Sequence, residues 1–167
     1  MPFAGRSYLP LIAVQTTWIV VVFVVVAWRT RAPRRVVVAA LVGSLLAGFV
    51  NMWTDALAHH LGWWRYPEAT TPFGPLLYYF AAGIGCGALG LGAWWVHRRF
   101  GSWAVVALFV AFAIYGPIRD AATARSTGLI DFDYSPALVV IVADALSGFT
   151  IPMAIAYATV HLGGAER

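Results

Sequence analysis

The sequence contains no lysine, one cysteine and few charged side chains of either sign. Without lysine, no retinal or pyridoxal Schiff base can form. Because Cys86 is the single cysteine, neither an internal disulfide nor a cysteine-rich metal or iron–sulfur site is expected. A cleaved signal peptide is also not expected, since the first apolar run is long enough to span a membrane and no small-residue cleavage site follows it. These absences exclude several kinds of cofactor chemistry.

Apolar residues dominate the chain instead. Of its 167 residues, 61% are hydrophobic and 11% are charged, and the mean hydropathy is +0.77. A water-soluble domain of this length does not need so many apolar residues, so we predict an all-α integral membrane protein. Residues 1–167 are predicted to form a single polytopic membrane domain.

Five apolar runs reach the length of about 20 residues that a membrane-spanning helix needs. The predicted spans are residues 8–28, 36–61, 74–96, 102–122 and 135–162. Arginines concentrate in the loops at 29–35 and 97–101, which together hold six of the eleven. The positive-inside rule therefore predicts a multi-pass protein of the cell membrane, with its N-terminus outside and its C-terminus in the cytoplasm.

A faint internal repeat relates the second and third spans to the fourth and fifth. The matching positions, 65 residues apart, are Asp55-Ala56 with Asp120-Ala121 and Gly83 with Gly148. If the repeat is real, each half is a helical hairpin, the two hairpins run parallel, and the first helix is added outside them. Coincidence explains so few identities equally well.

The second span ends in segment 51–68, which concentrates ionisable and aromatic residues. Helical spacing places Asn51, Asp55 and His59 at i, i+4 and i+8, so we expect them to share one face. An Asp–His pair four residues apart can serve as a proton relay or supply two metal ligands. No E-x-x-H pair or second histidine cluster lies nearby in the sequence, so no metal is predicted.

Three aspartates are expected in the outer half of the spans, where ionisable groups are costly and often mark functional sites. Asp55 and Asp120 lie at matching ends of the second and fourth spans. Asp144 is deeper, roughly 13 Å from the outer surface at 1.5 Å per residue. A carboxyl group in such a low-dielectric place can keep its proton and act as a general acid. Alternatively, Asp55 and Asp120 are interfacial residues that pair with Arg65, Arg119 or water.

Aromatic side chains could line a pocket around these carboxyl groups, because ring faces stabilise a carbocation without reacting with it. The candidates for substrate binding are Asn51, Trp53, Arg65, Tyr66, Tyr79, Tyr115 and Arg119. Packing against lipid explains many aromatic residues equally well. In particular, Trp63 and Trp64 are expected to anchor the outer interface, where an aromatic belt is usual.

The residues around Asp55 also form a motif found in known enzymes. The run Trp53-Thr54-Asp55, then Gly62-Trp63-Trp64-Arg65-Tyr66, then Pro72 and Gly74-Pro75-Leu76, resembles the W-D … G-x-W-x-Y … P-L-E-E pattern of small membrane-bound lycopene cyclases. A similar pattern occurs in other membrane cyclases of natural-product and terpenoid biosynthesis, including spirocyclases. The resemblance implies a polytopic, cofactor-poor enzyme that uses carboxyl groups to start or finish a cyclisation. Leu77-Tyr78-Tyr79 replace the paired glutamates of the family, so Asp55, Asp120 or Asp144 would have to supply the acid.

We therefore expect a membrane-embedded cyclase or isomerase that acts on a hydrophobic isoprenoid or polyketide-like substrate. Asp144 or Asp55 would donate a proton, and Asp120 or His59 would take one back. The expected partners are a hydrophobic small molecule and the lipid bilayer, with no metal, organic cofactor or nucleic acid. Glycines along the third span leave self-association open. The alternative is a non-enzymatic membrane protein, either a small carrier or a subunit of a larger complex.

Overall fold

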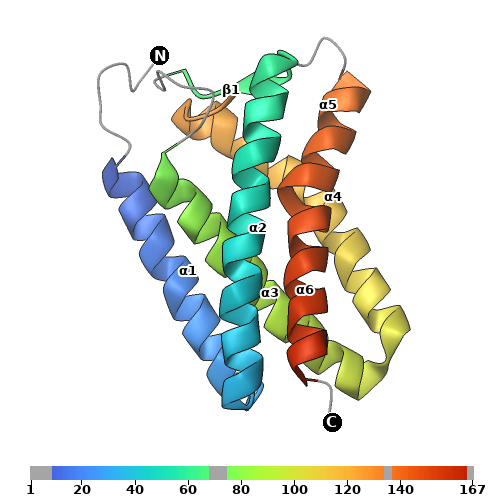
Figure 1. Ribbon diagram of the computed structural model, residues 1–167. Coiled ribbons are helices and arrows are strands. Elements are labelled where there is room, and N and C mark those ends of the chain that lie inside the picture. The colour runs from blue at the N-terminus through green and yellow to red at the C-terminus, as the bar shows by residue number, and fades with distance from the viewer. Residues whose placement is uncertain (1–8, 68–74, 134–136, 165–167) are drawn as a thin grey trace.

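The computed structural model describes residues 9–67, 75–133 and 137–164, and almost all of these residues are helical. The long helices are α1 (Leu9–Arg29), α2 (Arg34–His60), α3 (Leu76–Phe100) and α4 (Ser102–Thr127). The last helical segment is divided into α5 (Ala137–Asp144), the π-helical turn η1 (Ala145–Thr150) and α6 (Ile151–Gly164). Two short strands, β1 (Trp64–Arg65) and β2 (Asp131–Phe132), complete the described elements (Figure 1).

Within the described residues, five helical segments are long and apolar enough to cross a membrane, which confirms the all-α class and the expected number of candidate spans. The fifth combines α5, η1 and α6. Helices α3 and α4 continue past the expected ends at residues 96 and 122. The added turns contain Arg99 and Arg125. Arginine is a good helix former and its charge is favourable at a helix C-terminus, so these residues help the two helices to continue. The expected starts at residues 74 and 135 lie outside the described residues.

Helix α1 illustrates why these apolar runs are helical. It is rich in valine, which favours strands in water. In lipid, however, a single segment must satisfy all of its backbone N–H and C=O groups internally, and only a helix does so. Large apolar side chains of α1 are exposed on the outside of the bundle, including Trp18 (66%) and Val24 (58%). A surface of this kind is what a lipid-facing helix presents.

Helix α2 packs against both α3 and α6 in the middle of the bundle, and α1 packs against α3 (Figure 1). Small residues allow the helices to approach closely. A Cβ atom at Gly48 of α2 would lie 2.7 Å from the carbonyl oxygen of Tyr79 in α3, and one at Gly43 would lie 2.9 Å from the Cα atom of Ala156 in α6. This part of the core is therefore formed by close backbone contact.

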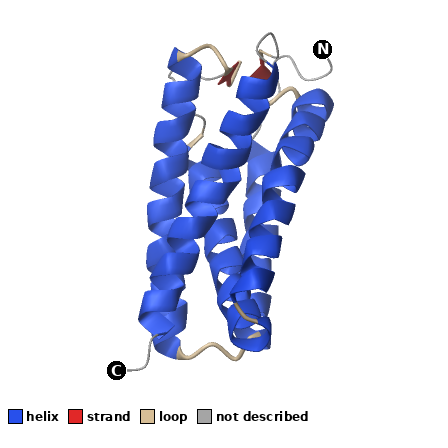
Figure 2. Ribbon diagram, turned by 90° about the vertical axis from the view of Figure 1, so that its right-hand side faces the viewer, coloured by secondary structure: helices blue, strands red, loops and turns tan. Residues whose placement is uncertain are grey.

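One end of the bundle, which we call the ribbon end, carries a two-stranded ribbon. Strand β1 pairs antiparallel with β2, so that Trp64 lies opposite Phe132 and Arg65 lies opposite Asp131. Helices α2 and α4 both stop near this end, where Gly62 and Gly128 have φ values of 71° and 70°. Figure 2 shows the ribbon at one end of the helices and the C-terminus at the other.

The opposite end, which we call the arginine end, holds the α1–α2 and α3–α4 turns. Its arginines are Arg29, Arg31, Arg34, Arg35, Arg98 and Arg99. The guanidinium carbon of Arg98 lies 5.0 Å from the centre of the Trp94 ring, and that of Arg99 lies 5.7 Å from the centre of the Trp95 ring. Both arginine-rich turns lie at the end of the bundle away from the ribbon (Figure 1).

Candidate functional site

A cavity of about 210 Å³, which we call the central cavity, lies among the helices next to the ribbon. Its walls come mainly from α2, α3, α4 and the α5–η1 segment, and Trp64 and Phe132 of the ribbon line it as well. Its polar lining includes Asn51, Asp55, Tyr66, Tyr78, Arg119, Asp120 and Asp144. The central cavity therefore brings together three aspartates that are far apart in the sequence.

The Asp55 carboxyl group accepts three hydrogen bonds. Trp64 Nε1 donates to Oδ1 at 3.0 Å, while the hydroxyl groups of Tyr66 and Tyr79 donate to Oδ2 at 2.6 and 2.9 Å. The donors belong to the ribbon region and to α3, so Asp55 connects the end of α2 to both. A carboxyl group surrounded by donors is arranged as an acceptor, which suits an anion or a base better than a proton donor.

Tyr66 contributes to this arrangement from the segment between α2 and α3. Its ring is buried and packs edge-on against Tyr78, with ring centres 6.0 Å apart. Burial raises the pKa of the Tyr66 hydroxyl well above its usual value of 10.0, and the neighbouring Tyr78 and Asp55 raise it further. The hydroxyl therefore keeps its proton at physiological pH and remains a hydrogen-bond donor to Asp55.

A second carboxyl arrangement lies on α4. Arg119 Nε donates to Asp120 Oδ1 at 2.7 Å, and Arg119 Nη2 forms an ion pair with the same oxygen. Asp144, at the end of α5, lies within hydrogen-bonding reach of Asp120. Both aspartates are buried, and the guanidinium carbon of Arg119 lies 4.8 Å from the centre of the Phe149 ring. This half of the cavity thus holds two neighbouring carboxyl groups and one cation.

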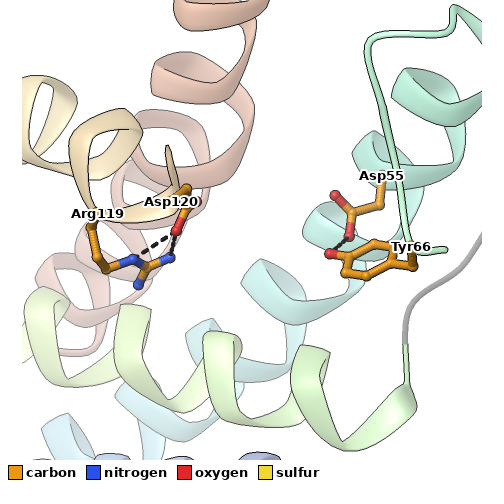
Figure 3. A network of polar contacts seen from close by, with 4 residues as sticks. All are labelled: Asp55, Tyr66, Arg119 and Asp120. Carbon is orange, nitrogen blue, oxygen red and sulfur yellow. Dashed lines mark hydrogen bonds and ion pairs between the residues drawn. The ribbon is translucent and has the colours of Figure 1, made fainter. Parts of the chain in front are cut away.

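Figure 3 shows one pair from each arrangement, with Asp55 and Tyr66 on one side of the site and Arg119 and Asp120 on the other. The two aspartates project from α2 and α4, which are separate in the chain. Tyr78 of α3 lines the cavity and is close enough to interact electrostatically with all three aspartates. The two carboxyl arrangements therefore face a common tyrosine.

An apolar groove of about 540 Å³, the α4–α5 groove, lies between α4 and α5. It opens to the outer surface of the bundle, since the exposed side chains of Ile114, Ile118 and Ile141 line it. Asp144 and Phe132 line both this groove and the central cavity. The groove therefore leads from the apolar surface to a buried carboxyl group.

A second apolar groove of about 360 Å³, the α2–α3 groove, lies between α2 and α3. Four of its lining residues correspond to residues of the α4–α5 groove 65 positions later. The correspondences are Gly48 with Ala113, Phe49 with Ile114, Met52 with Pro117, and Tyr79 with Asp144. The same spacing relates Asp55 to Asp120. The contact between Asp55 and Tyr79 in one hairpin thus corresponds to the contact between Asp120 and Asp144 in the other.

Most of the predicted site residues lie together. Those that line the central cavity are Asn51, Asp55, Tyr66, Arg119, Asp120 and Asp144. Tyr79 contacts Asp55 directly, although it lines the α2–α3 groove.

Four predicted residues lie away from the cavity. His59 is exposed, because eight residues of α-helix turn its side chain about 80° away from that of Asn51. The expectation that His59 shares the buried face of Asn51 is therefore wrong. Trp53 and Tyr115 are 55% and 54% exposed on α2 and α4. Arg65 is exposed and forms an ion pair with Asp131 at 2.9 Å.

Trp64 is a site residue whose position the sequence did not reveal. Its expected role as an interface anchor is wrong, because its ring is buried and its Nε1 donates to Asp55. One signal was available: Trp64 and Tyr66 are two residues apart, and alternate residues of an extended segment face the same side. Phe132 and Phe149 offered no such signal, since their places depend on strand pairing and on the π-helical turn.

No family model matches the chain, and no curated protein or solved structure matches it significantly. The similarity to membrane-bound lycopene cyclases stays a prediction, and two positions of its motif, Pro72 and Gly74, lie outside the described residues. Within the described part of the chain, no three histidine, cysteine or acidic side chains are grouped so as to hold a metal ion.

Proposed function

We propose that the chain is a membrane-embedded cyclase or isomerase that transfers protons to and from a hydrophobic isoprenoid or polyketide-like substrate without a cofactor. The central cavity carries this proposal, since it collects Asp55, Asp120 and Asp144 among helices that are apolar enough to cross a membrane. Ionisable groups are costly in such surroundings and usually serve a function there.

In this proposal the bundle lies in the cell membrane with its arginine end in the cytoplasm, as the positive-inside rule favours. The N-terminus and the ribbon end then lie outside, and the C-terminus lies inside. Asp55 and Asp120 are close to the ribbon ends of α2 and α4. The reaction would therefore take place in the outer half of the membrane.

The two carboxyl arrangements suit opposite roles. Asp120 and Asp144 can share a hydrogen bond only if one of them carries a proton. Because Arg119 forms an ion pair with Asp120, the proton resides on Asp144, which acts as the general acid. Asp55 already accepts three hydrogen bonds and acts as the base.

In the proposed reaction, the Asp144 carboxyl group donates its proton to one carbon of a double bond, and positive charge develops on the other carbon. The rings of Trp64, Tyr78 and Phe149 line the cavity and stabilise this charge. In a cyclisation, a second double bond of the same molecule attacks the cation. Asp55 then removes a proton from a neighbouring carbon, so the product is an isomer of the substrate. The cycle closes when the proton returns from Asp55 to Asp144 across the cavity that both line.

A non-enzymatic carrier or complex subunit is the alternative. The α4–α5 groove favours the enzyme, because it links the apolar surface of the bundle to Asp144. A carrier needs an aqueous path to both faces of the membrane. Among the described residues that line the central cavity, none belongs to the turns of the arginine end.

Deuterium incorporation tests the proposal. The purified protein in lipid nanodiscs would be incubated in D₂O with linear polyenes, both hydrocarbons such as lycopene and polyenes with acidic head groups. We expect a cyclised or isomerised product that contains carbon-bound deuterium, detected by chromatography and mass spectrometry. Asp144→Asn and Asp55→Asn should each lower the rate of its formation by about 10²–10⁴-fold, the usual contribution of general acid–base catalysis.

Asp131→Asn is the matched control, since Asp131 is an exposed aspartate of the same end that pairs with Arg65. It should keep a rate close to that of the wild type, and thermal unfolding would show that each variant folds. The proposal is wrong if folded Asp144→Asn and Asp55→Asn variants react at the wild-type rate. It is also wrong if the wild type yields no deuterated product but carries protons across liposome membranes.

A further inference from the structure

The central cavity is too small to enclose a whole isoprenoid substrate. Its volume of about 210 Å³ is below the range of about 300–1,000 Å³ that is usual for sites that bury a drug-sized ligand. The α4–α5 groove, with about 540 Å³, lies within that range and shares Asp144 and Phe132 with the cavity. Most of a molecule that reacts at Asp144 would therefore have to lie in the groove.

The α4–α5 groove is long, apolar and charged at two places. Its lining runs along α4 from Ala113 to Arg125, which is about 18 Å at 1.5 Å per residue. Among its described lining residues, Arg125 and Asp144 are the ionisable ones. Arg125 lies in the last turn of α4, close to the ribbon end. The groove thus offers a cation near one end and an extended apolar path that passes the acid.

Arg125 differs from Arg65 and Arg119, the other described arginines outside the arginine end. Arg65 pairs with Asp131 and Arg119 pairs with Asp120, but within residues 9–67, 75–133 and 137–164 no ion pair involves Arg125. Its side chain is exposed and lines the groove. A guanidinium group at the mouth of an apolar groove is complementary to a molecule that has an anionic head group and a hydrocarbon chain.

From this juxtaposition we infer that the α4–α5 groove binds a single-chain amphiphile, with its carboxylate or phosphate head group at Arg125 and its unsaturated chain along α4, past Asp144. The reaction of this molecule rests on the proposed function, but its binding does not. Binding requires the groove and Arg125, whereas proton transfer requires Asp144. The substrates of the proposed proton transfer are then polyenes with an acidic head group.

Binding of cis-parinaric acid, a fluorescent polyenoic acid, tests the inference. The probe would be titrated onto the protein in phosphatidylcholine nanodiscs, and energy transfer from tryptophan to the probe would report binding. The methyl ester of the probe would serve as the uncharged comparison ligand. We expect saturable binding of the acid that is displaced by farnesyl monophosphate but not by farnesol. Arg125→Gln should weaken binding of the acid by about tenfold and leave that of the ester unchanged. Arg65→Gln, at an exposed arginine that is already paired, is the control and should change neither.

Two further variants separate the groove from the chemistry. Ala121→Phe fills the α4–α5 groove and should weaken binding of both acid and ester, whereas Leu45→Phe in the α2–α3 groove should not. A wild type that binds the probe in the groove but forms no deuterated product would overturn the proposed function and support the inference about binding.

Two results would overturn the inference itself. One is unchanged affinity for the acid in folded Arg125→Gln and Ala121→Phe variants. The other is displacement of the probe by phosphatidylglycerol in the nanodisc as effectively as by farnesyl monophosphate, which would make the groove a site for membrane lipid.

Discussion

In the α2–α3 hairpin, the Tyr79 hydroxyl donates to Asp55 at 2.9 Å, whereas at the corresponding place between α4 and α5, 65 positions later, Asp144 faces Asp120. A tyrosine hydroxyl at neutral pH can only donate a hydrogen bond to the aspartate or accept one, but a second carboxyl group can share a proton with it. The second helix of each hairpin, α3 or α5, therefore decides the chemistry of the aspartate, because it supplies the side chain that the aspartate contacts.

The two grooves differ in a corresponding way. Tyr79 is 4% exposed, and among the described lining residues none is common to the α2–α3 groove and the central cavity. Asp144 occupies the matching place with a smaller side chain, and here the groove and the cavity share it. One half of the molecule thus separates its groove from the carboxyl groups, and the other half connects them.

The largest effect is expected from Asp144→Tyr, which would give the second half the partner that the first half has. A tyrosine hydroxyl, with an ordinary pKa near 10, is too weak an acid to protonate an alkene in place of a carboxyl group. The rate of formation of deuterated product should fall by about 10²–10⁴-fold. Leu138→Tyr, at a position of α5 that is 75% exposed, is the control and should keep its activity. A folded Asp144→Tyr variant with the wild-type rate would refute Asp144 as the acid.

A smaller effect is expected from the matched glycines Gly83 and Gly148. A Cβ atom at Gly83 would overlap the Ser44 carbonyl oxygen and lie 3.1 Å from the Gly48 nitrogen, whereas one at Gly148 would lie 3.0 Å from a carboxyl oxygen of Asp144. Gly83→Ala should cost about 1–3 kcal/mol of stability, because the α2 and α3 backbones must separate. Gly148→Ala should cost less, since a side chain can move.

Unfolding of both glycine variants in the same detergent measures this difference. Equal losses of stability would contradict the conclusion that the α2–α3 hairpin is held by close backbone contact and its counterpart is not.

The smallest effect concerns Tyr66, whose counterpart 65 positions later is the exposed Asp131. Burial raises the pKa of the Tyr66 hydroxyl, so its proton is held more tightly in the folded state than in the unfolded state. The stability linked to this proton is complete below about pH 10 and is lost as the pH rises through the folded-state pKa. Above about pH 10, this residue should lower the free energy of unfolding by up to about 1.4 kcal/mol per pH unit.

Unfolding measured between about pH 8 and pH 11 checks this dependence. The Tyr66→Phe variant lacks the group and should lose stability less steeply than the wild type. Identical slopes for the two proteins would show that Tyr66 does not titrate differently in the folded and unfolded states.

The placement of the three aspartates at one end of the bundle could be predicted from the sequence. Helices of similar length that alternate in direction bring Asp55, Asp120 and the first part of α5 to the same end. The burial of Trp64 could not be predicted, because it depends on the pairing of β1 with β2 across two helices. His59 was misplaced because at i+8 it lies about 80° around α2 from Asn51, and helical spacing alone does not show how far the buried face extends.

Hydropathy alone indicated the five helical segments of the described residues that are apolar enough to cross a membrane, because the requirement that a segment in lipid satisfy its own backbone applies to each segment separately and can be read residue by residue. Only the tertiary structure decided which side chains meet the aspartates. The rotation and crossing of the helices set those contacts, and they assigned Tyr66, Trp64 and Tyr79 to Asp55 but Arg119 and Asp144 to Asp120. Hydropathy does not contain this information, since it is the same for every rotation of a helix.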